Sequence, residues 1–247
     1  GILSVVDSDI LTERIPANLR DQDNQWFGLS TRARVIIYNK AVGRPEGLSD
    51  YEDLADPAYR GQICMRSSSN IYNISLLSSI IAQAGPEAAA DWVSGVVDNF
   101  ARRPQSNDTG QIEAVASGEC GLSVVNSYYL ARLARSDDPQ TQAIVAAVGI
   151  IFPNQDDRGT HVNISGAGIP VHAPNRENAI QFLEYLTRPS AQSYFADGNN
   201  EYPVIESLPG NAAVQALGAF KADSFNVADL GPNQTEAIRI FDEGGWP

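Results

Sequence analysis

Residues 109–133 read TGQIEAVASGECGLSVVNSYYLARL, and this stretch decides the fold. Its first part predicts a short helix over Thr109–Ala116, which a glycine turn closes. The next part, Gly121–Asn126, is apolar and predicts a strand that runs directly into Tyr128 and Tyr129. In open α/β sheets, ligands bind beyond the carboxyl ends of the strands. The tyrosine pair therefore lies where a binding site is expected.

Strand-like and helix-like segments also alternate upstream of this stretch. Gln62–Arg66 predicts a strand, and Ile74–Ala84 and Glu87–Phe100 predict two helices that Gly85 and the following proline separate. In the second helix Trp92 lies on the apolar face, which indicates a core residue. This alternation predicts an α/β fold with a largely parallel sheet.

A change of composition follows in the second half of the chain. Asn154–Gly168 is rich in Gly, Asn, Asp and Ser, and Gly168–Val171 predicts a strand that returns to a different sheet. Asn175–Thr187 predicts a helix with an apolar stripe, and Pro189–Phe195 predicts the start of another. We therefore expect a boundary between two lobes in this region.

Bulk composition limits the class of protein. The chain has 247 residues, of which 43% are hydrophobic, so it can bury a core as one large domain or as two lobes. It contains no run of about 18 apolar residues that would span a bilayer. Its 17 Lys and Arg residues stand against 30 Asp and Glu residues, a net charge of −13, which opposes binding to nucleic-acid phosphates. Acidity suits a cationic or neutral ligand, or serves solubility alone.

Enzyme chemistry finds little support in the sequence. Only two histidines occur, His161 and His172, and their separation matches no helical metal pair, so both are interpreted as structural. No Gly-x-Ser-x-Gly elbow and no glycine-rich nucleotide fingerprint are present. The sequence therefore predicts a protein that is not an enzyme.

The only two cysteines are Cys64 and Cys120. Each lies in a short strand-like run, so neighbouring strands could bring them together as a disulfide in an oxidising compartment. Two separate buried thiols are the alternative interpretation.

Two polar loops at strand ends carry tyrosines. Ser67–Asn73 follows one predicted strand and contains Tyr72, and Asn126–Tyr129 follows another. A phenolate is a hard oxygen donor with a pKa near 10, so it suits a strongly Lewis-acidic trivalent ion such as Fe(III) that displaces its proton. A tyrosine pair also occurs commonly as packing residues, and on spacing alone both interpretations stay open.

A family resemblance supports the metal interpretation. The chain resembles the ferric-iron substrate-binding proteins of bacterial ABC importers, most of all their cyanobacterial, iron-deficiency-induced branch. The segments that carry the resemblance are QWFGLSTRARVIIYNK from Gln25, LSDYEDLADPAYRGQICMRSSSNIYN from Leu48, NFARRPQSNDTGQIEAVASGECGLSVVNSYYLARL from Asn99 and HVNISGAGIPVHAPN from His161.

Members of this branch bind the metal with three tyrosines in the second and third of these segments. The matching residues are Tyr72, Tyr128 and Tyr129, which the resemblance implies are metal ligands. Arg103 and Asn126 match polar positions beside the site and are expected to orient the phenolates and offset their charge.

The resemblance also implies an architecture, a compartment and partners. The expected fold is an α/β, two-lobe periplasmic binding protein of type II, or Venus-flytrap, form. Residues 1–33 and 160–208 would form the first lobe, residues 34–159 and 209–247 the second, with the metal cleft between them. Because family members carry a strand and helices ahead of the point matched by Gly1, the first lobe is expected to lack its amino-terminal part, which supplies further ligands.

The expected function is to bind Fe(III) in the periplasm and deliver it to the permease of an ABC-type iron importer in the inner membrane. The protein is expected to be a monomer with no nucleic-acid partner. The alternative is a binding protein for a small organic ligand such as a polyamine, thiamine or a phosphate ester, which would stack on aromatic rings and pair with Asp or Arg.

Overall fold

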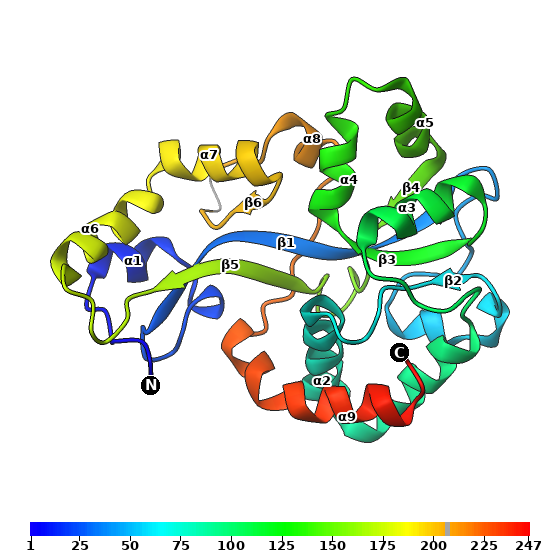
Figure 1. Cartoon of the computed structure of the whole chain (residues 1–247), viewed down its shortest axis with the longest axis horizontal. Coiled ribbons are helices and arrows are strands. Elements are labelled where there is room, and N and C mark those ends of the chain that lie inside the picture. Colours follow the sequence, from blue (N-terminus) through cyan, green and yellow to red (C-terminus); the bar gives the residue numbers. More distant parts are fainter. Residues whose placement is uncertain (206–207) are drawn as a thin grey trace.

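One long strand, β1 (Trp26–Asn39), runs through the middle of the molecule and belongs to both of its halves (Figure 1). This computed structural model describes residues 1–205 and 208–247. Residues 206 and 207, which fall within the predicted first lobe, lie outside the described residues. The two halves follow from the way β1 changes its partners along its length.

The first half of β1 pairs with β5 (Val162–Gly168) and β6 (Tyr202–Pro203), both antiparallel. The predicted strand at Gly168–Val171 is wrong in its position, because the strand precedes these residues. Gly166 and Gly168 permit this pairing. A Cβ atom on Gly166 would lie 2.8 Å from the carbonyl oxygen of Phe27, and one on Gly168 would lie 2.5 Å from that of Gln25. The helices of this half are α1 (Asp9–Arg14), α6 (Arg176–Leu186) and α7 (Pro189–Asn199).

The second half of β1 lies between β3 (Leu122–Asn126) and β4 (Val148–Ile151), and both run antiparallel to it. The short strand β2 (Ile63–Cys64) is parallel to β3, to which it connects through helices. The expected largely parallel sheet is therefore wrong, because four of the five strand pairings in the described residues are antiparallel. Parallel pairing needs a helical crossover between adjacent strands, and only β2 and β3 have one.

The predicted break between two helices is confirmed. A helical segment, α2, spans Ile71–Asp98, but Gly85 inside it has φ 86° and ψ 167°, which are not helical values. The other helices are α3 (Asp108–Ser117), α4 (Ser127–Ala134), α5 (Pro139–Ala147), α8 (Ala212–Gln215) and α9 (Gln234–Glu243). Short 3-10 turns cover Ala17–Leu19, Glu52–Ala55, Pro57–Tyr59 and Val227–Asn233.

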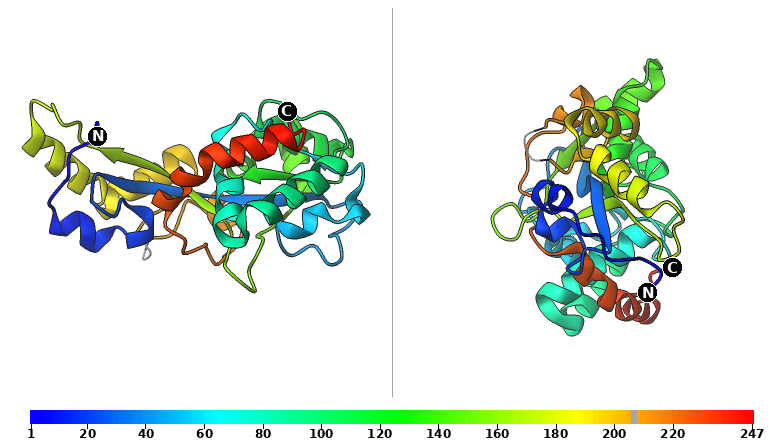
Figure 2. Two further views of the ribbon diagram at one scale, coloured as in Figure 1. Left: turned by 90° about the horizontal axis from the view of Figure 1, so that it is seen from below. Right: turned by 90° about the vertical axis from the view of Figure 1, so that its left-hand side faces the viewer.

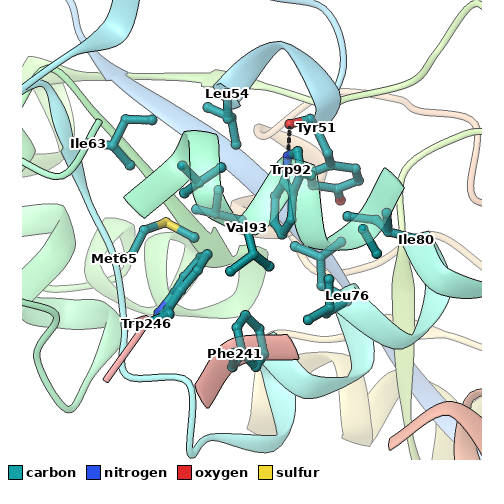
Figure 3. Close-up of a cluster of buried hydrophobic side chains, with 14 of the residues drawn as sticks. Tyr51, Leu54, Ile63, Met65, Leu76, Ile80, Trp92, Val93, Phe241 and Trp246 are labelled. Atoms are coloured by element: carbon teal, nitrogen blue, oxygen red, sulfur yellow. Dashed lines mark hydrogen bonds between the residues drawn. The ribbon is translucent and has the colours of Figure 1, made fainter. Parts of the chain in front are cut away.

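The largest core lies in the second half, where α9 packs against α2 (Figure 3). The ring of Trp246 lies edge-on to that of Phe241, with centroids 5.0 Å apart, and 6.0 Å from that of Trp92. The indole of Trp92 donates a 2.7 Å hydrogen bond to the carbonyl oxygen of Tyr51. Trp92 is 5% exposed, so its predicted core position is confirmed.

The whole chain is elongated, with the two halves arranged end to end along β1 and β5 (Figure 2). Its first and last residues lie in different halves. Across the described ranges, we find no helix with the length and apolar character needed to cross a membrane.

Candidate metal centre

Tyr128 and Tyr129 lie in the first turn of α4, directly after β3. Every residue of β3 is buried, which fixes the strand in the sheet. The hydroxyl of Ser127 accepts a 3.2 Å hydrogen bond from the backbone N–H of Ala33 and so attaches the start of α4 to β1. The predicted position of the tyrosine pair at the carboxyl end of a strand is confirmed.

Tyr72 lies in the first turn of α2, after the loop that follows β2. The side chain of Asn70 caps this helix by accepting a 2.9 Å hydrogen bond from the backbone N–H of Tyr72. Because β2 and β3 are parallel neighbours, their carboxyl ends meet at the same edge of the sheet. The two helix starts that carry the three tyrosines therefore lie side by side.

The structure brings all three tyrosines together. The hydroxyl oxygens of Tyr72 and Tyr128 are 3.0 Å apart, and the rings of Tyr128 and Tyr129 stack with centroids 4.3 Å apart. Burial raises the pKa of Tyr128 far above its ordinary value of 10.0, and hydrogen bonds with Tyr129 and Tyr72 raise it further. Tyr128 is thus protonated at neutral pH, and a ligand that needs its phenolate must displace the proton.

Positive charge surrounds the tyrosine rings. The guanidinium carbon of Arg66 lies 4.9 Å from the ring centroid of Tyr72, and those of Arg32 and Arg34 each lie 5.9 Å from it. A fourth arginine on α4 lies 5.0 Å from the ring centroid of Tyr129. Cations over aromatic faces are attracted by the ring quadrupole, and the attraction grows when the ring carries negative charge.

A buried ion pair fixes this arrangement from behind. Arg34 is 2% exposed and Asp108 is fully buried, and their charged groups are 2.7 Å apart. Asp108 also lies 3.3 Å from Arg66 and accepts a 2.8 Å hydrogen bond from the backbone N–H of Asn126. On its other side, Arg34 donates a 2.6 Å hydrogen bond to Asn73. One carboxylate thus connects β1, the loop after β2 and the end of β3.

The sequence did not single out Arg66 or Asp108 as functional residues. Arg66 ends a predicted strand, and Asp108 directly precedes the predicted helix Thr109–Ala116, so both occupy boundary positions where site residues are common. Neither position reveals from sequence alone that the two side chains meet.

Asn126 and Arg103 differ in where the structure places them. Asn126 is 3% exposed, its side-chain oxygen accepts a 3.3 Å hydrogen bond from Arg34, and its amide nitrogen has no partner among the described residues. Arg103 is exposed, and within residues 1–205 and 208–247 it takes part in no side-chain hydrogen bond or ion pair. Both expected roles beside the site stay predictions.

Other metal-binding chemistry is sparse in this structure. Within the part of the chain that the structure describes, no group of three or more His, Cys, Asp and Glu side chains could hold a metal ion. His161 is buried with its Nε2 atom 3.1 Å from Ser75, and His172 is exposed.

Each of the two cysteines precedes, along the chain, one of the two helix starts that carry the tyrosines. Cys64 of β2 and Cys120, two residues before β3, form a disulfide with their Cα atoms 5.8 Å apart. Arg102 donates a 3.0 Å hydrogen bond to the sulfur of Cys64. The covalent bond thus joins β2 to the segment directly before β3.

Two α/β halves joined by crossing strands, with polar side chains at strand ends near the crossing, define the class of two-lobe solute-binding proteins. Within this class, the chain belongs to the family of bacterial extracellular solute-binding proteins, whose model matches residues 2–227. Members of this family are carriers and not a class of enzymes.

Two cyanobacterial relatives carry the names of iron uptake proteins. The chain is 50% identical to iron uptake protein A1 of Synechocystis over 246 residues, which cover 100% of this chain and 68% of the relative. It is 49% identical to iron uptake protein A2 of the same organism and covers 72% of it. The resemblance to the ferric-iron binding family is thereby confirmed.

Solved structures agree with the fold. The Trichodesmium protein IdiA (FutA), in complex with iron and citrate, superposes with a TM-score of 0.97 at 52% identity and covers 100% of this chain and 78% of its own. The ferric binding protein of Campylobacter jejuni superposes with a TM-score of 0.92 at 40% identity, over 99% of this chain and 78% of its own. These matches confirm the predicted two-lobe α/β class.

Proposed function

We propose that this protein binds Fe(III) through the phenolates of Tyr72, Tyr128 and Tyr129 and delivers it to an ABC-type importer. The observation that carries this proposal is the convergence of the three side chains, with two hydroxyls 3.0 Å apart and two rings stacked. The named iron-binding relatives support the choice of metal.

Charge explains why this site would select a trivalent ion. Three phenolates together carry about three negative charges. This total matches Fe(III) and exceeds the charge of a divalent competitor. The arginines around Tyr72 stabilise the phenolates while the metal is bound. Each bound phenolate releases a proton, so the affinity for iron falls as the pH falls, by up to about tenfold per pH unit for each proton.

The cleft that holds the metal lies between the two lobes. The proposed boundaries are residues 1–33 with 160–208 and residues 34–159 with 209–247. The register of β1 supports them, because Ala33 still pairs with Val162 of β5 while Arg34 already pairs with Asn126 of β3. Relative movement of the lobes about β1 and β5 would close the cleft over the metal and exclude water.

The disulfide and the acidic composition of the chain support a compartment and a set of partners. A disulfide is stable in an oxidising compartment, which supports a place in the periplasm. The partner would be the permease of an iron importer in the inner membrane. The net negative charge supports a protein that stays monomeric and does not bind nucleic acid. Binding and delivery of a metal ion require no catalysis.

Metal retention tests this proposal. The purified protein would be dialysed against Fe(III) citrate, and in parallel against Mg²⁺, Ca²⁺ and Zn²⁺, and the retained metal measured by elemental mass spectrometry. We expect one iron per chain and no comparable retention of a divalent ion. Calorimetric titration with spermidine, thiamine and a phosphate ester covers the organic-ligand alternative, and binding of one of these without iron retention would contradict the proposal.

A further inference from the structure

Ser75 lies one helical turn beyond Tyr72 on α2 and is 3% exposed. Its hydroxyl is 3.1 Å from Nε2 of His161 and accepts a 2.8 Å hydrogen bond from the side-chain amide of Asn163. It also lies 3.3 Å from the carbonyl oxygen of Tyr72. One small side chain is thus connected to the metal-binding turn of α2 and to a distant segment.

That distant segment is the place where the chain returns from one half of the molecule to the other. Asn163 belongs to β5, and His161 precedes it by two residues. The carbonyl oxygen of His161 accepts a 3.0 Å hydrogen bond from the backbone N–H of Arg34, and Asn163 pairs with Arg32 of β1. Ser75 therefore attaches the start of α2 to the segment that enters β5, and this segment is itself paired with β1.

The single hydroxyl proton of Ser75 has two acceptors within reach. Ser75 donates it to the carbonyl oxygen of Tyr72, or to Nε2 of His161 when the imidazole carries its own proton on Nδ1. Its oxygen then remains free to accept from Asn163. Ser75 and His161 are buried and Asn163 is half-buried, and removing the hydroxyl would leave the amide donor of Asn163 without this partner.

We propose that Ser75 is a positioning residue that holds the Tyr72 turn of α2 against the crossing strands and so fixes the Tyr72 hydroxyl beside Tyr128. This inference rests on the proposed function. Without the Ser75 contacts, the first turn of α2 moves more freely against β1 and β5, and the three phenolates lose their common position. Bound iron then leaves faster, and its absorption band shifts.

The test compares Ser75→Ala with Ser79→Ala in the full protein. Ser79 is a matched control, because it is 2% exposed, lies one turn further along α2 and donates only to the carbonyl oxygen of Leu76 in its own helix, at 2.8 Å. Iron loss to an excess of a competing chelator would be followed through the visible band, and the melting temperature of each apo variant would be measured in parallel.

We expect Ser75→Ala to release iron about tenfold faster than wild type, the effect of one lost buried hydrogen bond, while Ser79→Ala stays within about twofold. Adding Asn163→Ala to Ser75→Ala should change the rate little further, because both substitutions remove the same contact.

Three results would overturn the inference. Iron release from the Ser75→Ala variant at the wild-type rate would contradict a specific positioning role while leaving the proposed function intact. The same conclusion would follow if Ser79→Ala accelerated iron release equally at an equal melting temperature. A wild-type protein with no visible band on adding Fe(III) would contradict the proposed function itself, and the inference with it.

Discussion

Tyr128 contacts both of the other tyrosines, and its place in the first turn of a helix explains how. Adjacent side chains on a strand point to opposite faces, whereas on a helix they lie about 100° apart and can contribute to one site. β3 ends at Asn126 and α4 begins at Ser127, so the change of backbone occurs just before the tyrosine pair. The residue types and this strand-to-helix transition could be predicted from the sequence.

The arginines and the buried carboxylate could not be predicted in the same way. Arg34 is separated by 74 positions from Asp108, and only the pairing of β1 with β3 brings them together. No local pattern encodes such a contact, because it depends on the register of two strands. The same holds for Ser75 and His161, which are 86 positions apart.

His161 gives a prediction at the residue scale. Burial lowers its pKa to about 3, and the charges of Arg34 and two further arginines act in the same direction. Between pH 6.5 and 3 the unfolded chain therefore binds a proton that the folded protein does not. The free energy of unfolding should fall as the pH falls through this window, by up to about 1.4 kcal/mol per pH unit from this group.

Urea unfolding of the apo protein at pH 7, 6, 5 and 4 measures this dependence. His161→Gln should reduce the slope, and His172→Gln should leave it unchanged because His172 is exposed. Identical slopes for wild type and His161→Gln would show that His161 is not held neutral in the folded state.

At the scale of elements, the sequence predicted helices better than strands. Helix ends carry local signals, such as the Gly85 break, which appears in the structure, whereas the predicted start at Ile74 was late because α2 begins at Ile71, directly after its Asn70 cap. The strand β5 was displaced by several residues in the prediction because its sequence, VNISGAG, is rich in small residues. Its pairing follows from the close approach to β1, which is a property of the assembled sheet.

Asp108 should be the most sensitive ion-pair residue in the protein. It connects Arg34, Arg66 and the end of β3, so Asp108→Ala leaves two arginines without their partner, one of them buried. We expect a loss of about 3–5 kcal/mol in the free energy of unfolding, measured by urea denaturation. Asp98→Ala is the control, because its pair with Arg60 is exposed and should contribute only about 0–1 kcal/mol. Equal effects of the two substitutions would contradict the importance of the buried network.

The disulfide should stabilise the folded chain substantially. Cys64 and Cys120 are 56 positions apart, and closing a loop of this length removes unfolded-state entropy equivalent to about 4 kcal/mol. The double substitution Cys64→Ala with Cys120→Ala should lower the free energy of unfolding by about this amount. Thiol titration of the unfolded wild type without reductant should detect no free thiol, and two free thiols would show that the bond does not form.

At the scale of the whole molecule, the crossing strands bring the parts of the site together. β1 passes from one half to the other and changes partners between Ala33 and Arg34, close to the tyrosine cluster. The prediction of a largely parallel sheet was wrong because β1 is shared by two lobes. The segments that return along it run antiparallel to it. The two-lobe class nevertheless could be inferred from the four family-like segments, which are spread along the chain from Gln25 to Asn175.

The most direct measurement is a visible absorption titration of the protein with Fe(III), set against the triple variant Tyr72→Phe, Tyr128→Phe and Tyr129→Phe. Tyr185→Phe, on the half-exposed surface of α6, serves as the control substitution. The account predicts a phenolate-to-iron band that saturates at one iron per wild-type and control chain and is lost in the triple variant. A wild type without the band, or a triple variant that keeps it, would contradict iron binding by these three tyrosines.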